Sequence, residues 1–147
     1  MKITLLGGTG SIGRVFLEEA IAAGHELRIY GRTSPNANGA DFIRGELSDK
    51  VAMTAAVRGS DAVVNTVGVR SKDDIPVITV AVSNIITVME NADVRRLVSI
   101  SGAGVRLPGD RRGPLGHIAT WIARSMAYDM IACKQGEYEL IARSHLE

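Results

Sequence analysis

The chain has 147 residues, a formal net charge of +1 and a single cysteine. That length allows one domain with a hydrophobic core, and we expect a single domain over residues 1–147. A charge so close to zero gives no indication of a nucleic-acid, membrane or polyanionic partner. Because one cysteine excludes an internal disulfide framework, and because the first residues lack a secretory signal pattern, we expect a cytoplasmic protein. No apolar run reaches the roughly 18 residues of a transmembrane helix.

Short apolar runs alternate with segments of helical periodicity along the chain, which is typical of β-α-β units on a parallel sheet. We therefore predict the α/β class and a Rossmann fold, a doubly wound parallel sheet with strand order 3-2-1-4-5 and helices on both faces. The predicted strands are 3–6, 25–30, 41–44, 62–66 and 96–101. The predicted helices are 12–23, 48–58, 75–91 and 115 to nearly the end, the last in one or two pieces.

Local signals mark the ends and the buried face of these helices. Gly24 is expected just past the end of the first helix, where a left-handed residue is common. Ser48 is the predicted N-cap of the second helix, and Asp74 caps the third with Pro76 in its first turn. The predicted buried face of the first helix holds Ile12, Val15, Phe16, Ala20 and Ala23.

A glycine motif stands between the first strand and the first helix. Gly7, Gly10 and Gly13 form a G-x-x-G-x-x-G loop, in the strand–turn–helix context that binds dinucleotides. The helix N-terminus offers unpaired N–H groups to the pyrophosphate. The alternative is a glycine-rich turn without a ligand. The predicted cofactor-binding residues of this segment are Gly7, Thr9, Gly10, Ser11, Ile12 and Gly13.

The residues after the second strand indicate which dinucleotide binds. NAD-preferring Rossmann domains place an acid there for the ribose 2′-hydroxyl, whereas this chain has Arg32 and Thr33. A guanidinium matches a 2′-phosphate, so we predict that NADP(H) is preferred over NAD(H). The alternative is that Arg32 is a solvated loop cation.

One polar residue, Asn84, falls on an apolar stripe of the third helix. A buried amide without a partner costs about 1–3 kcal/mol, so Asn84 needs a hydrogen bond. It either serves a neighbouring backbone carbonyl or helps to position the active site. The predicted stripe is Val77, Val80, Ala81, Ile85 and Val88.

Together these motifs resemble the atypical short-chain dehydrogenase/reductase superfamily. The chain is most similar to its NAD(P)H-binding branch, which includes flavin and biliverdin-IXβ reductases, NmrA-like sensors and epimerase/dehydratase-like proteins. The resemblance implies that Glu46 and Leu47 border the adenine and that Thr66, Val67 and Gly68 line the ribose. It also implies two catalytic residues, Ser101 near the substrate and Lys134 on the nicotinamide ribose. The motifs that carry the resemblance are Gly7-x-x-Gly10-x-x-Gly13, Arg32, Gly45-Glu46-Leu47, Thr66-Val67-Gly68, Asn84, Leu97-Val98-Ser99-Ile100-Ser101-Gly102 and Lys134-x-x-Glu137.

The chain departs from that family pattern in its proton donor. The family's tyrosine, four residues before the lysine, is Met130 here, and Tyr128 lies about 200° away around a helix. Glu46 stands where Asp is usual, and Gly102 replaces the second serine of a common pair. Relatives continue past the segment matching 144–147 into a sixth strand and a substrate-covering region, which we expect this chain to lack.

We therefore predict an NADP(H)-dependent oxidoreductase that reduces a flavin or a similar flat conjugated acceptor, because a flavin itself accepts the hydride. The alternatives are a non-catalytic, NmrA-like NADP(H) sensor and a nucleotide-sugar epimerase/dehydratase-like enzyme. We expect a small-molecule substrate and a monomer or homodimer. For Lys134 the alternative to a cofactor role is an intrahelical pair with Glu137.

The remaining reactive residue types give weaker signals. The histidines are too far apart for metal ligation, so no metal site is predicted. Cys133 either has a thiol pKa lowered by Lys134 or is a packing residue. The loop arginines either bind an anionic substrate or are solvated; they are Arg106, Arg111 and Arg112. The apolar residues of the last helix are interpreted as core or dimer contacts, namely Trp121, Ile122, Met126 and Tyr128.

Overall fold

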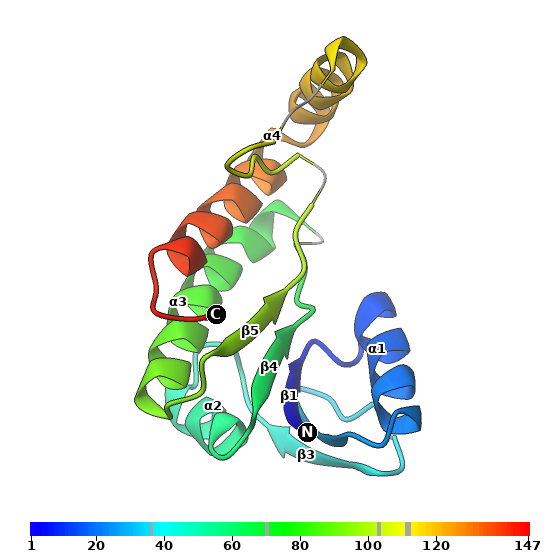
Figure 1. Ribbon diagram of the computed structural model, residues 1–147, viewed down its shortest axis with the longest axis vertical. Coiled ribbons are helices and arrows are strands. Elements are labelled where there is room, and N and C mark those ends of the chain that lie inside the picture. The colour runs from blue at the N-terminus through cyan, green and yellow to red at the C-terminus, as the bar shows by residue number, and fades with distance from the viewer. Residues whose placement is uncertain (36, 70, 103, 111–112) are drawn as a thin grey trace.

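The computed structural model describes residues 1–35, 37–69, 71–102, 104–110 and 113–147, without the side chains of 114–126. Five parallel strands form one sheet in the order β3-β2-β1-β4-β5, with helices on both faces (Figure 1). The predicted Rossmann fold and strand order are thus confirmed. The strands are β1 Lys2–Leu6, β2 Glu26–Gly31, β3 Ala40–Arg44, β4 Ala62–Asn65 and β5 Arg96–Ser99. The helices are α1 Ser11–Ala22, α2 Lys50–Val57, the 3-10 turn η1 Lys72–Asp74, α3 Ile75–Asn91 and α4 Pro114–Ala142.

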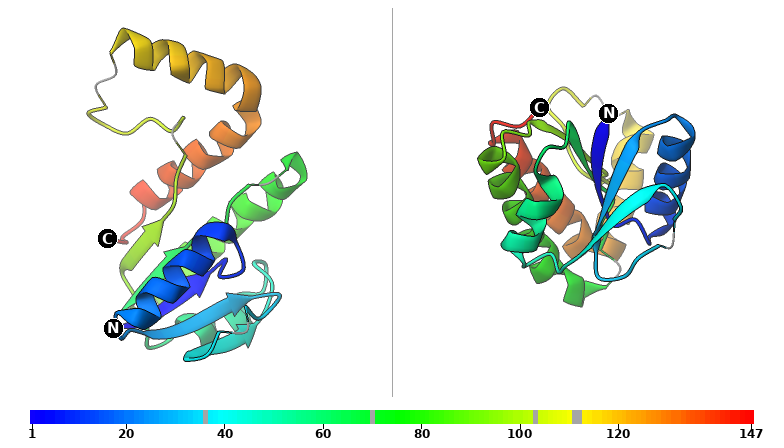
Figure 2. Two further views of the ribbon diagram at one scale, coloured as in Figure 1. Left: turned by 90° about the vertical axis from the view of Figure 1, so that its right-hand side faces the viewer. Right: turned by 90° about the horizontal axis from the view of Figure 1, so that it is seen from below.

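Each face of the sheet has its own hydrophobic core, because both faces of a parallel sheet must be covered. Helix α1 lies on one face, whereas α2 and α3 lie on the other, with the second half of α4 beside α3 (Figure 2). The buried core under α1 consists of Ile3, Leu5, Leu17, Ala20, Leu27, Ile29 and Val64. The buried core under α2 and α3 consists of Leu6, Tyr30, Met53, Ala56, Val57, Val63, Ile85, Val88, Met89 and Val94.

The predicted buried face of α1 was partly wrong. Ile12 and Val15 are 52% and 60% exposed, and the fully buried residues are Gly13, Leu17 and Ala20. The helix presents Gly13 to the sheet because its backbone approaches the glycine loop there. A Cβ at Gly13 would lie 2.2 Å from the carbonyl oxygen of Gly7. Close backbone packing, rather than the largest side chains, therefore sets the orientation of α1.

The α3 stripe needs a similar correction. Ala81, Ile85 and Val88 are buried as predicted, whereas Val77 and Val80 are more than half exposed. The first turns of α3 extend past the carboxyl ends of the strands (Figure 1), so the sheet does not lie beneath them.

Most helix ends follow the predicted signals. Gly24 follows α1 with a positive φ of 77°, and Asp74 is the N-cap residue of α3. The predicted cap Ser48 was wrong, because the next residue, Asp49, accepts a hydrogen bond from the Ala52 N–H at 3.0 Å. Helix α4 consists of two helical pieces, since the backbone of Ala127 is not helical (φ −137°, ψ 38°). In the described part of the chain, none of the helices combines the length and apolar character needed to cross a membrane.

Candidate functional site

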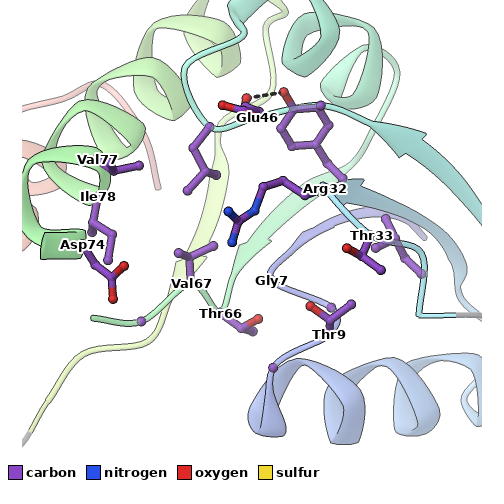
Figure 3. A pocket seen from close by; sticks show the side chains of 18 of the residues that line it. Gly7, Thr9, Arg32, Thr33, Glu46, Thr66, Val67, Asp74, Val77 and Ile78 are labelled. Atoms are coloured by element: carbon purple, nitrogen blue, oxygen red, sulfur yellow. Dashed lines mark hydrogen bonds between the residues drawn. The ribbon is translucent and has the colours of Figure 1, made fainter. Parts of the chain in front are cut away.

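A cavity of about 330 Å³ opens at the carboxyl ends of the strands. It lies where the chain order reverses between β1 and β4, which is the usual ligand position in a doubly wound sheet. Figure 3 shows the side chains that line it. The lining residues come from five segments: Gly7–Gly10, Ile29–Thr33, Gly45–Ser48, Thr66–Gly68, and Asp74 with Val77 and Ile78.

The glycine loop forms the floor of this cavity beside α1. Gly7 has a φ of 84°, and a Cβ there would lie 2.7 Å from the hydroxyl oxygen of Thr66. The N–H of Gly10 donates to the Gly7 carbonyl at 2.9 Å, and Gly10 is the N-cap residue of α1. The first-turn N–H groups of α1 are therefore available at the cavity, the arrangement that favours a phosphate. Gly7, Thr9 and Gly10 line the cavity; Ser11, Ile12 and Gly13 lie behind them in the first turn of α1.

The end of β4 supplies the opposite edge of the floor. Both the backbone N–H and the hydroxyl of Thr66 donate to the Leu6 carbonyl, at 3.0 and 2.8 Å. The buried Asn65 accepts the Val67 N–H at 3.1 Å and donates to the Ser99 hydroxyl at 3.3 Å. Asn65 thus shapes the predicted ribose segment, although sequence reasoning missed it. The available signal was an amide ending an otherwise apolar strand.

Charged groups of both signs face the cavity. The Arg32 side chain extends into the opening, with Thr33 beside the glycine loop (Figure 3). Two carboxylates, Glu46 and Asp74, lie on the other walls. One Asp74 oxygen accepts the Ser71 N–H at 2.9 Å, which orients that carboxylate. Among the described lining residues, Arg32 is thus the group suited to an anionic 2′-phosphate.

The wall formed by Gly45–Ser48 is held by buried side chains. The Tyr30 hydroxyl donates to the carbonyls of Glu46 and Asp49, at 2.6 and 3.1 Å. The Asn84 amide donates to the Leu47 carbonyl at 2.9 Å. Burial, with the Asp49 and Glu46 charges, raises the pKa of Tyr30 to about 12, so its hydroxyl remains a donor at working pH. Asn84 therefore has the backbone carbonyl partner that its burial required, and that carbonyl belongs to the cavity wall.

Lys134 reaches the edge of the site from α4. Its ammonium donates to the Val67 carbonyl at 3.2 Å and to the Glu137 carboxylate at 2.8 Å. The Lys134 and Glu137 side chains are 14% and 4% exposed. Burial raises the pKa of Glu137, and the Lys134 charge opposes that rise. The predicted pair with Glu137 is present, and the same lysine contacts the loop that lines the cavity, although it is not itself a lining residue.

Several other predicted residues lie away from the cavity. Ser101 is exposed beyond the end of β5 and does not line the cavity. Cys133 is buried, and burial raises its thiol pKa, so the packing interpretation holds and the lowered pKa was wrong. Tyr128 is 61% exposed, so it is not a core residue of this chain.

Of the three loop arginines, the structure describes Arg106 alone. The Arg106 backbone is held by Gln135 of α4, which accepts its N–H at 2.8 Å. Arg111 and Arg112 lie outside the described residues, as do the side chains of His117, Trp121, Ile122 and Met126. In the described ranges, no group of three or more His, Cys, Asp or Glu side chains could hold a metal ion.

Comparison with known proteins places these features in a family. The model of the NAD(P)H-binding family matches residues 7–147. An isoflavone reductase homologue of Solanum tuberosum is 32% identical over 80 residues, and the match covers 46% of this chain but only 26% of that protein. The chain therefore matches about a quarter of this curated relative.

Solved structures show the same fold at low identity. The anaerobillin reductase ChuY of Escherichia coli O157:H7 matches with a TM-score of 0.78 at 18% identity, over 100% of this chain and 69% of that one. A short-chain dehydrogenase/reductase of Veillonella parvula in complex with NADP matches with a TM-score of 0.73 at 19% identity, over 99% and 65%. Because the family model covers residues 7–147, and because the glycine loop and the cavity at the strand ends agree with it, the chain belongs to the NAD(P)H-binding family.

Proposed function

We propose that the protein is an NADP(H)-dependent oxidoreductase that reduces a flavin or a similar flat conjugated acceptor. The observation that carries the cofactor preference is Arg32, which follows β2 and extends into the cavity. No acid occupies the adjoining positions, where an NAD-preferring site would hold a ribose 2′-hydroxyl. The crowding of Gly7 and Gly13 by their neighbours supports the fit, because a Cβ there would clash with Thr66 or with the Gly7 carbonyl and would displace the glycine loop from the start of α1.

The residues present suit a reaction in which the protein does not have to supply a proton donor. When bound, the nicotinamide supplies a hydride. Lys134, held between Val67 and Glu137, contributes a positive charge and hydrogen-bond donors at the edge of the cavity. Met130 takes the place of the family's tyrosine, so a phenol is not supplied at that helical position. An acceptor that takes the hydride on its own ring system therefore fits this chain better than a simple carbonyl, which needs a proton donor in place.

Fluorescence titration of NADPH and NADH tests the cofactor preference. We expect tighter binding of NADPH, and we expect Arg32→Ala to weaken NADPH by about 10- to 100-fold with little effect on NADH, since a charged hydrogen bond contributes about 1.5–3 kcal/mol. Arg143→Ala is the matched control, because it removes the same charge from the far end of α4. An NADPH/NADH affinity ratio that Arg32→Ala leaves unchanged overturns the assignment.

An absorbance assay with FMN, FAD and quinones tests the reaction. We expect NADPH oxidation above background with at least one of these acceptors. The second candidate, a non-catalytic NADP(H) sensor, rests on Met130 and is distinguished by the same assay. A sensor binds NADP⁺ and NADPH with different affinities and turns over none of the acceptors.

A further inference from the structure

The loop Gly45–Asp49, named here the β3 loop, connects β3 to α2 and forms one wall of the cavity. Going outward from the reversal point, the sheet runs β1, β2, β3. The glycine loop after β1 suits the pyrophosphate, and Arg32 after β2 suits the 2′-phosphate. The β3 loop follows next in this order, where it would face the adenosine half of a bound dinucleotide.

Two buried polar side chains hold this loop from opposite elements. Tyr30 comes from β2 and is 1% exposed, and Asn84 comes from α3 and is 4% exposed. Together they donate to three backbone carbonyls of the loop, those of Glu46, Leu47 and Asp49. Burying a polar side chain costs free energy unless the side chain is hydrogen-bonded. Two buried side chains that both donate to one short loop therefore indicate that the position of this loop matters.

The ring of Tyr30 also fixes how close the loop can come. A Cβ at Gly45 would lie 2.4 Å from the Tyr30 hydroxyl oxygen, so the backbone of Gly45 rests directly against the phenol. The Gly45 N–H donates to the Gly31 carbonyl at 3.0 Å, which ties the loop to the end of β2. With its carbonyls directed at Tyr30 and Asn84, the loop presents Glu46 and Leu47 to the cavity.

We infer that Tyr30 and Asn84 are positioning residues that hold the β3 loop in the shape that binds the adenosine half of the cofactor. This inference rests on the proposed function. The two side chains act through the loop, so their loss changes affinity for the adenosine half while the fold persists. We expect the fold to survive Tyr30→Phe because the Glu46 and Asp49 carbonyls each accept a second, backbone hydrogen bond, from Asp49 and Met53.

The test measures the binding of NADPH and of adenosine 2′,5′-bisphosphate to the full chain. We expect Tyr30→Phe and Asn84→Leu to weaken both ligands by the same factor, about three- to tenfold, as for the loss of one hydrogen bond. The matched control is Thr4→Val, which removes a fully buried hydroxyl that donates to the Ala56 carbonyl at 2.8 Å, away from the cavity. The control is expected to bind both ligands as the wild type does.

A second measurement separates positioning from general destabilisation. Amide hydrogen exchange of the ligand-free protein should rise in the β3 loop of Tyr30→Phe and Asn84→Leu, and not in that loop of Thr4→Val. Unchanged affinity for the bisphosphate in both variants, or an equal loss in Thr4→Val, overturns the inference while the proposed function stands. A wild-type protein that binds neither ligand overturns the proposed function and this inference with it.

Discussion

The region around the carboxyl ends of the strands has two sides, which are held in shape by different means. On the side of β1, β2 and β3, glycine backbone packs directly against its neighbours: Gly13 against the Gly7 carbonyl, and Gly45 against the Tyr30 ring. On the side of β5 and α4, long side chains bridge gaps, with Lys134 reaching the Val67 carbonyl and Gln135 holding the Arg106 backbone. On the first side a Cβ at Gly13 would meet backbone, 2.2 Å from the Gly7 carbonyl oxygen, whereas on the second side a Cβ at Gly104 would meet a flexible side chain, that of Ile131, at 2.7 Å. We call the first the rigid side and the second the adaptable side; on the proposed function, the first would hold the dinucleotide and an acceptor would approach at the second.

The largest expected effect comes from breaking the rigid side at Gly13. Gly13→Ala places a Cβ 2.2 Å from the Gly7 carbonyl oxygen, so the backbone must move. We expect loss of measurable NADPH binding and a decrease of about 1–3 kcal/mol in the free energy of unfolding. Gly136→Ala on α4 is the control, because a Cβ there meets nothing within 4 Å. The control should bind NADPH normally and gain up to about 1 kcal/mol, since alanine is the better helix former. Equal behaviour of the two variants would remove the contrast between the two sides.

The part of the rigid side that could be predicted from the sequence is the glycine loop, for a physical reason. Gly13 packs against Gly7, which is six residues earlier in the chain, so the spacing of the glycines after a strand was sufficient. Asn65 and Tyr30 were missed because their partners, Ser99 and the β3 loop, come from other strands. Ser48 and Asp49 are adjacent acceptors, and only the backbone of the helix start decides between them.

The predicted buried faces failed where tertiary contacts outweigh side-chain size. Ile12 and Val15 made an apolar pattern on α1, but the approach of Gly13 to the glycine loop turned them outward. Val77 and Val80 fit the periodicity of α3, but that part of the helix lies beyond the strand ends. Periodicity identifies an amphipathic helix without showing how far the sheet extends beneath it.

A second, smaller effect is expected on the α4 side, at Lys134. The double variant Lys134→Met with Glu137→Gln removes the ammonium without leaving a buried carboxylate unpaired. We expect NADPH affinity to fall about three- to tenfold, as for one charge-assisted contact, with little change in thermal stability. Glu137→Gln alone is the control and should retain most of the affinity. If the double variant binds NADPH as tightly as this control does, Lys134 only anchors the loop at Val67.

The buried pair also predicts a pH dependence of stability. Burial raises the pKa of Glu137 in the folded state, so the folded protein holds that proton more tightly than the unfolded chain does. The stability that Glu137 contributes is therefore fully present below the usual pKa of a glutamate and is lost as the pH rises through the raised pKa of the folded state. Urea unfolding at about pH 5 and about pH 8 should show Glu137→Gln gaining stability relative to wild type at the higher pH. The exposed Glu139→Gln is the control and should follow the wild type at both pH values.

The smallest effect is expected at Gln135, which sharpens the contrast because it belongs entirely to the adaptable side. Its amide accepts the Arg106 N–H at 2.8 Å and donates to the Arg106 carbonyl at 3.4 Å, and so fastens the segment after β5 to α4. Gln135→Ala removes both bonds at a partly exposed position, where we expect a loss of about 0.5–1 kcal/mol.

We expect Gln135→Ala to change the KM for the acceptor and to leave the affinity for NADPH unchanged. The segment that carries Arg106 lies after β5, so its loosening should raise the KM for the acceptor two- to threefold, about the effect of a fraction of a kcal/mol. NADPH affinity should stay unchanged, because the glycine loop, Arg32 and the β3 loop make no hydrogen bond to Gln135 among the described residues. Hydrogen exchange at the Arg106 amide checks the clamp itself without any ligand. Faster exchange with a lower NADPH affinity would mean that the two sides are coupled, and the division between a rigid and an adaptable side would fail.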